Sequence, residues 1–185
     1  MICEKTELKR IIKLEEKLNY DRGFWRKITL FFSADPRRFI SLFLKYYRKE
    51  EYYFNTNKMF LFHLFKRKRR KLGLKLGFTM DINCIDEGLI IYHYGNIVIN
   101  SNAKIGKNCK LHGNNCIGND GKNIDIAPII GDNVDIGYGA NIIGDVKIGS
   151  NVKIGASACV VNSFNESNIT LVGVPAKKVW KSYER

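Results

Sequence analysis

Aliphatic residues recur at every sixth position through the second half of the chain. The first run comprises Ile99, Ile105, Leu111 and Ile117, and the second comprises Ile130, Ile136, Ile142, Ile148, Ile154 and Val160. Two residues before each of these positions stands a second residue, in most cases small or apolar. Because side chains two residues apart point to the same face of a strand, both columns should point inward.

Residues that favour tight corners follow each aliphatic position. Gly comes directly after most of them, and Asn, Asp, Gly or Ser stands three residues after every one. These residues tolerate a positive φ. The period therefore predicts an all-β fold, a parallel β-helix of short strands wound as a coil. An amphipathic helix would need spacings of 3 and 4, and the remaining alternative, a β-sandwich, would show longer strands and irregular turns.

The step from Ile117 to Ile130 is longer than the others, so residues 118–129 should leave the coil as a loop. Insertions in repeat proteins map to loops on one face, often the functional one. We expect the coil to span residues 78–170 and a tail to span residues 171–185.

Residues 1–77 lack the six-residue period and favour helices at 4–18, 24–32, 36–50 and 56–71. Asp35 before Pro36 is a credible N-cap followed by proline in the first helical turn.

The net charge of +13 lies entirely in this first segment. Residues 1–77 hold 21 basic and 8 acidic residues, whereas the remainder holds 10 of each. The run MFLFHLFKRKRRKLGLKLG (59–77) carries seven of the basic residues. Three interpretations stay open. The run can be a helix packed on its neighbours or on another subunit, or a peripheral contact with an anionic membrane surface, while nucleic-acid binding is the weakest because the coil is neutral.

Five cysteines form no CxxC pair and are widely scattered, which indicates reduced thiols in a cytoplasmic compartment. The N-terminus lacks the apolar core of a signal peptide, and no apolar run reaches the roughly 18 to 20 residues of a spanning helix. We expect a cytoplasmic protein, with the inner face of the membrane as a further option.

Counting back by six from Ile99 places His93, Glu87 and Asp81 in the inward column. A buried imidazole must find polar partners, and beside a carboxylate it can act as a base near neutral pH. A structural histidine at the rim of the coil is the alternative.

The stretch IYHYGNIVINSNAKIGKNCKLHGNNCIGN resembles the catalytic stretch of serine acetyltransferases, a branch of the hexapeptide-repeat acyltransferases. The resemblance implies a left-handed parallel β-helix with three hexads per turn, acetyl-CoA as the donor without a metal, and a homotrimer with active sites between subunits.

On the same resemblance, His93 falls on the catalytic base and Asp81 on the carboxylate that orients it. The spacing of 12 residues is shorter than in the family, so Asp86 or Glu87 can substitute for Asp81. Tyr92 replaces an acidic residue that normally precedes the base. His112 should lie on the adjacent turn, where it could bond the acceptor or the thioester oxygen, or could be a plain surface histidine.

The resemblance also suggests a donor site. It consists of small residues along the coil and a basic segment near the C-terminus that would face phosphates. Its candidate residues are Gly118, Gly137, Tyr138, Ala156, Lys177 and Lys178. Corner geometry alone is an alternative reason for the glycines.

The acceptor is predicted from a departure from the family. Where serine acetyltransferases carry Arg-His-Pro, this chain has Ile126, Ala127 and Pro128, so an amino acid carboxylate would have no obvious arginine partner here. The chain is therefore expected to be closest to enzymes that O-acetylate sugars of surface polysaccharides.

Four alternatives remain. They are a serine O-acetyltransferase, a metal-dependent hydratase that would need three histidines, a non-catalytic scaffold that presents the basic segment, and catalysis through a cysteine nucleophile. The last is disfavoured because Cys109 and Cys159 stand at or beside inward positions.

Overall fold

The computed structural model describes residues 1–20 and 35–179. Its helices are α1 (Lys5–Tyr20), α3 (Pro36–Asn55) and α4 (Met59–Leu76). Its strands are β1 (Phe78–Thr79), β2 (Ile90–Ile91), β3 (Ile97–Ile99), β4 (Lys104–Ile105), β5 (Lys110–Leu111), β6 (Cys116–Gly118), β7 (Ile129–Ile130), β8 (Asp135–Ile136), β9 (Asn141–Ile143), β10 (Lys147–Ile148), β11 (Lys153–Ile154), β12 (Cys159–Val160), β13 (Thr170–Val172) and β14 (Lys177–Val179). The helix predicted at 24–32 lies outside the described residues.

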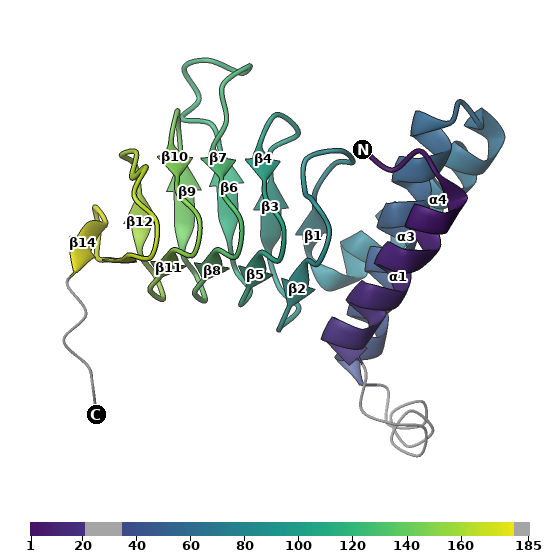
Figure 1. The fold of residues 1–185 in the computed structure, drawn as a ribbon, viewed down its shortest axis with the longest axis horizontal. Coiled ribbons are helices and arrows are strands. Elements are labelled where there is room, and N and C mark those ends of the chain that lie inside the picture. Colours follow the sequence, from purple (N-terminus) through teal and green to yellow (C-terminus); the bar gives the residue numbers. More distant parts are fainter. Residues whose placement is uncertain (21–34, 180–185) are drawn as a thin grey trace.

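The strands wind into a coil with three sheets as its sides, and all pairs are parallel except β13 with β14 (Figure 1). The sheets have the strand orders β1-β3-β6-β9-β12, β10-β7-β4 and β14-β13-β11-β8-β5-β2. Ile99 pairs with Ile117, Ile117 with Ile142, and Ile142 with Val160, so every third repeat returns to the same side. The predicted parallel β-helix is confirmed, while its left-handed sense stays a prediction.

The inward columns form one continuous aliphatic core. Both predicted columns are buried, with Ala103, Val134 and Ala140 as examples of the second one. Asn115 is the one fully buried polar side chain among the described coil residues. It accepts a hydrogen bond from the Gly113 amide at 3.0 Å and donates to the Gly137 carbonyl at 2.8 Å, so its burial leaves no polar atom unsatisfied.

The corners use the residues that the pattern predicts. Asn108, Asn133 and Asn151 all have φ near +55°, and their amides form a ladder with bonds of 3.0 Å between successive turns. The loop between β6 and β7 projects from the coil, as expected for residues 118–129 (Figure 1).

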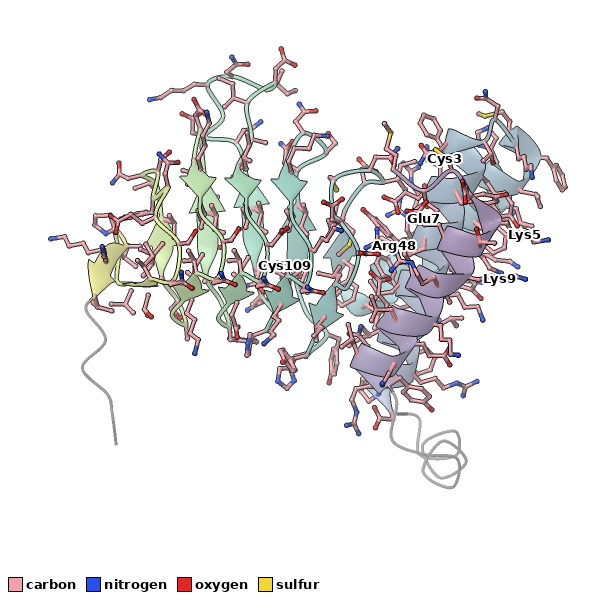
Figure 2. The ribbon with its side chains drawn as sticks, viewed as in Figure 1. Cys3, Lys5, Glu7, Lys9, Arg48 and Cys109 are labelled. Atoms are coloured by element: carbon pink, nitrogen blue, oxygen red, sulfur yellow. The ribbon has the colours of Figure 1, made fainter. Side chains whose placement is uncertain are left out.

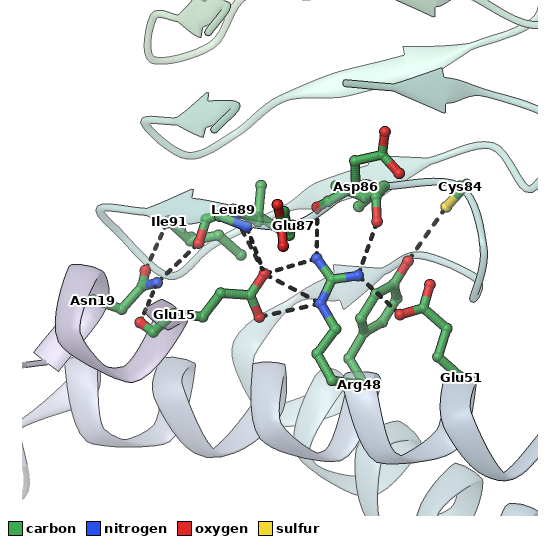
Figure 3. Close-up of polar contacts among 12 residues, drawn as sticks. Glu15, Asn19, Arg48, Glu51, Cys84, Asp86, Glu87, Leu89 and Ile91 are labelled. Carbon is green, nitrogen blue, oxygen red and sulfur yellow. Dashed lines mark hydrogen bonds and ion pairs between the residues drawn. The ribbon is translucent and has the colours of Figure 1, made fainter. Parts of the chain in front are cut away.

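The helices gather at the β1 end of the coil, and buried ions join the two parts (Figures 1 and 2). The Arg48 guanidinium bonds Glu15 at 2.7 Å and Glu51 at 2.8 Å, and it donates to the Ile85 carbonyl at 2.8 Å (Figure 3). Burial alone would lower the pKa of Arg48, but the two carboxylates outweigh burial and raise it well above its usual value. Arg48 therefore stays charged at 2% side-chain exposure.

α1 also closes the outer edge of strand β2. The Asn19 side chain accepts from the Ile91 amide and donates to the Leu89 carbonyl, both at 2.9 Å (Figure 3). An uncovered edge strand would expose these groups. The helical segment is thus bound to the turn of the coil that leads to His93.

The first turn of the coil differs from the predicted register. β1 pairs with β3 through Phe78 and Ile97, and β2 pairs with β5 through Ile91 and Leu111. The buried positions are therefore Met80, Ile85 and Ile91. The expectation that Asp81, Glu87 and His93 point inward is wrong. The step from Ile91 to Ile99 has eight residues in place of six, and the step from Met80 to Ile85 has five.

The ends of the other segments also differ in detail. The last helix begins at Met59 and continues to Leu76, five residues beyond the predicted 56–71. Within the predicted tail, β13 and β14 form an antiparallel pair, Leu171 opposite Lys178.

Candidate active site

His93 lies on one edge of the coil, in a column of stacked corners. The corners follow β2, β5, β8 and β11, and backbone bonds link them. The Gly139 amide donates to the Gly113 carbonyl at 2.9 Å, and the Ser157 amide donates to the Tyr138 carbonyl at 2.8 Å. We call residues 92–95, 112–114, 137–139 and 155–157 the His93 corner column.

Gly113 opens space beside the His93 side chain. A Cβ on Gly113 would come within 3.3 Å of the His93 Cβ and 3.2 Å of the Tyr138 ring, and its φ of +113° is one that other residues rarely adopt. His93 itself is exposed, so its imidazole can meet a ligand from outside the coil.

A second histidine stands next to this corner and has a carboxylate partner. His112 Nε2 lies 2.8 Å from Asp135 Oδ1, and its ring centroid is 4.5 Å from that of Tyr92. Ile91 of β2 pairs with Leu111 of β5, so one turn of the coil takes 20 residues here. Tyr92 rather than His93 therefore stacks directly on His112. The expectation that the two histidines occupy adjacent turns is confirmed, with an offset of one residue.

The predicted pair of His93 and Asp81 is not formed within the described chain. Asp81 follows Met80 at a different corner, where its carboxylate lies 3.7 Å from Arg69. Glu87, one substitute, bonds Arg10 and lies 3.4 Å from Lys107. The other, Asp86, accepts a bond from Arg48 through its backbone carbonyl. Within the described chain, Asp81 therefore pairs with Arg69 and does not orient the His93 imidazole.

The predicted donor residues divide between two places. Gly137, Tyr138 and Ala156 lie in the His93 corner column, and Tyr138 is 50% exposed. Gly118 is at another edge, where its carbonyl accepts from the Gly144 amide at 2.9 Å. A Cβ on Gly137 would come within 2.6 Å of the Ala156 amide nitrogen, so corner geometry already requires that glycine.

The two C-terminal lysines lie on β14, at the end of the coil opposite to the helices (Figure 1). Lys178 forms an ion pair with Glu166, and Lys177 is exposed. Their predicted role toward phosphates stays a prediction.

A pocket of about 400 Å³ lies between the start of α3 and the His93 corner. Its walls include Asp35 and Arg37 beside Tyr92, His93 and Tyr94. The sequence predicts Asp35 only as a helix cap, and its side chain does accept a bond from the Arg37 amide at 2.8 Å. No spacing rule connects the start of α3 to a corner of the coil, so this part of the site was missed.

Asp35 and Arg37 form an ion pair inside the pocket wall. Arg37 Nε lies 3.0 Å from Asp35 Oδ1, and Nη2 lies 2.5 Å from Oδ2. The hydrogen bond to Asp35 raises the pKa of Arg37. One anionic and one cationic group therefore stand together next to the exposed imidazole.

Two of the coil cysteines are poorly suited to act as nucleophiles. Cys109 lies inside the coil, fully buried, and burial raises the pKa of its thiol to about 12 (Figure 2). Burial also raises the pKa of the Cys116 thiol. Because the thiolate is the reactive form, these residues disfavour a covalent route.

Over residues 1–20 and 35–179, no group of three or more His, Cys, Asp or Glu side chains could hold a metal ion. In that same part of the chain, no helix is both long and apolar enough to span a bilayer.

Comparisons with known proteins point in one direction. No family model matches the chain. It is 40% identical over 126 residues to a probable serine acetyltransferase 5 of Oryza sativa subsp. japonica. The aligned region covers 63% of this chain and 37% of that protein. The chain therefore spans little more than a third of the curated relative.

Solved structures of serine acetyltransferases share the fold. The Neisseria gonorrhoeae enzyme gives a TM-score of 0.69 at 28% identity, over 98% of this chain and 70% of that one, and it is also solved in complex with serine. The Brucella abortus enzyme in complex with coenzyme A gives a TM-score of 0.70 at 21% identity, over 95% and 68%.

These relatives are serine acetyltransferases, so the predicted closeness to polysaccharide O-acetyltransferases is not shown. The agreement covers the helices as well as the coil, which periodicity alone could not anticipate. In sequence and in fold, the chain is similar to the serine acetyltransferase-like hexapeptide-repeat acyltransferases.

Proposed function

We propose that the chain is an acetyl-CoA-dependent O-acetyltransferase with His93 as its general base and that L-serine is its leading acceptor. The observation that carries the proposal is the exposed His93 imidazole, which lies beside Gly113 and Tyr138 and opens onto the pocket of Asp35 and Arg37. The relatives named above support acetyl transfer and favour serine over a sugar.

The chemistry needs no covalent enzyme intermediate. His93 takes the proton of the acceptor hydroxyl as the oxygen attacks the thioester carbonyl, and a C–O bond forms. The tetrahedral oxyanion would be stabilised by a backbone N–H. When the C–S bond breaks, the imidazolium returns its proton to the coenzyme A thiolate. The products are the acetyl ester and free coenzyme A.

The pair of Asp35 and Arg37 supports a zwitterionic acceptor. The Arg37 guanidinium offers donors to a carboxylate, and the Asp35 carboxylate offers an acceptor to an ammonium group. The chain lacks Arg-His at Ile126 and Ala127, but it has an arginine next to His93 that comes from α3. Loss of the family residues is therefore not by itself an argument against an amino acid.

A sugar hydroxyl remains the second candidate acceptor. The aromatic rings of Tyr92 and Tyr94 line the same pocket and are both exposed, as expected of a wall that packs against a sugar ring. The scaffold alternative, without catalysis, makes no use of this pocket.

The acceptor is tested by coenzyme A release from acetyl-CoA with L-serine and, separately, with a panel of nucleotide sugars. His93→Ala should lower the rate with either acceptor by about 10²- to 10⁴-fold. If this variant, folded as judged by circular dichroism, retained more than roughly a tenth of the wild-type rate, the role of His93 would be wrong.

Arg37→Gln separates the two acceptors. With serine, KM should rise by about tenfold or more while kcat changes less, because a charge-assisted contact in the bound state is lost. Lys45→Gln, on an exposed position of the same helix, is the matched control. If acetyl transfer to a sugar were faster than transfer to serine, and if Arg37→Gln did not change its rate, the acceptor would be a sugar and not serine.

The homotrimer also remains a prediction from the resemblance. Light scattering on the full chain tests it. A monomer with full activity would contradict the expectation that each active site lies between two subunits.

A further inference from the structure

The outer face of α4 carries a basic surface that the proposed chemistry leaves unused. The helix buries one stripe, at Phe62, Phe65, Arg69, Gly73 and Leu76. The opposite stripe is exposed and repeats at spacings of three and four. It contains Phe60, Leu64, Arg67, Lys71 and Leu74, with His63, Arg70 and Lys75 beside it. We call these eight residues the outer face of α4.

The charges on this face lack partners in the described structure. α4 contains seven basic and no acidic residues. Arg69 is turned inward and pairs with Glu50. Over residues 1–20 and 35–179, the salt bridges include none of Arg67, Arg70, Lys71 or Lys75. The outer face therefore keeps an uncompensated positive charge.

The basic residues surround a shallow hollow of about 550 Å³. It is lined by His63, Lys66, Arg67, Arg70, Lys71 and Leu74. A phosphate group in this hollow would meet several cationic side chains at once, and an arginine side chain can bind phosphate with two parallel bonds.

Large apolar side chains stand at both ends of the same stripe. Phe60 is 83% exposed and Leu74 is 88% exposed. Leu74 stands fourteen positions after Phe60, which is roughly 21 Å along the helix at 1.5 Å per residue. A helix that combines a cationic face with exposed Phe and Leu suits the boundary between lipid headgroups and acyl chains.

We propose that the outer face of α4 binds an anionic membrane surface, with its cations on lipid phosphates and with Phe60 and Leu74 entering the interface. Charge argues against a second copy of this chain as the occupant, because two such faces would repel each other. The apolar ends favour lipid over nucleic acid. The inference is independent of the acetyl acceptor.

The test is co-sedimentation of the full chain with two kinds of vesicle, phosphatidylcholine alone and phosphatidylcholine with 30% phosphatidylserine. The wild type should bind the anionic vesicles more strongly, and the binding should weaken as salt rises. The variant Arg67→Gln/Arg70→Gln/Lys71→Gln/Lys75→Gln should lose about 10- to 10³-fold in partition coefficient.

A matched control removes the same charge elsewhere. Lys104→Gln/Lys122→Gln/Lys147→Gln/Lys153→Gln changes four exposed lysines of the coil and should keep vesicle binding to within about twofold to threefold. Arg69 is left intact in both variants, because its loss would strand the buried Glu50. Phe60→Ser/Leu74→Ser should weaken binding while keeping its salt dependence.

Three results would overturn the proposal. They are equal binding of both vesicle types, equal loss in the outer-face and coil variants, and binding of a homopolymer RNA without binding of anionic vesicles. Circular dichroism and light scattering establish that each variant keeps its fold and assembly, so that a loss of binding reports on the surface.

Discussion

The coil and the helical segment bury polar groups in opposite ways. Among the described residues, the coil buries the single polar side chain Asn115, while the helices bury five charged ones. These are Glu15, Arg48, Glu50, Glu51 and Arg69. The coil is held by aliphatic columns that repeat, whereas the helices are joined to it by ion networks in which every group depends on a particular partner. The spacing of residues in the sequence predicts a periodic core. It does not predict an ion network in which each group has one particular partner.

The largest expected effect comes from breaking the Arg48 network. Arg48→Ala would leave Glu15 and Glu51 buried without their cation and should cost about 3–5 kcal/mol in the free energy of unfolding. Urea denaturation followed by circular dichroism measures it. A loss below about 1 kcal/mol would mean that the network does not hold the two regions together.

A cavity in the coil should come next. Ile136 is fully buried between Leu111 and Ile154 of the neighbouring turns, so Ile136→Ala should cost about 2–5 kcal/mol. The same denaturation experiment applies, and Ile142→Ala serves as the matched position on another sheet. Widely different losses at the two sites would contradict the view that the columns are equivalent.

The corners should be more tolerant than the columns. Asn133 has φ +56°, and Asn133→Ala should cost about 1–2 kcal/mol because Ala is strained in that conformation. Asn133→Gly should recover part of the loss, since glycine adopts a positive φ freely. Equal losses for Ala and Gly would assign the effect to the amide ladder with Asn108 and Asn151 instead.

The smallest effect is expected for an exposed ion pair at the same junction. Arg10 pairs with Glu87, but its side chain is 57% exposed, so Arg10→Ala should cost less than about 1 kcal/mol. Comparison with Arg48→Ala isolates burial as the variable. A cost similar to that of Arg48→Ala would show that burial is not what makes the inner network strong.

The first turn of the coil shows where pattern reasoning fails. From Ile99 onward, each six-residue step returns a buried aliphatic residue, and the same period resumes at Ile130 after the loop. Counting backward from Ile99 fails because the corner after Ile91 is two residues longer, which moves His93 from the expected interior to the surface. The residue types between Ile91 and Ile99 do not predict the length of that corner.

The candidate site shows the same division. The motif around His93 identified this histidine and its neighbour His112, and the count along the coil placed the two on adjacent turns, but the predicted register put His93 inside the coil although it is exposed. The sequence could not identify Asp135 as the partner of His112, because the inserted loop hides which residues pair between the strands of Leu111 and Ile136. It also could not bring Asp35 and Arg37 to His93, since that contact depends on how α3 docks.

The sequence by itself determined the coil, its corners, the place of its loop and the concentration of positive charge in residues 1–77. These follow from local rules: side chains alternate along a strand, and a few residue types tolerate a positive φ. The tertiary structure alone decided which helix face meets the coil, which ions are buried and which pocket opens beside His93. Those features depend on contacts between residues far apart in the chain, where geometry selects one partner among many that the sequence offers.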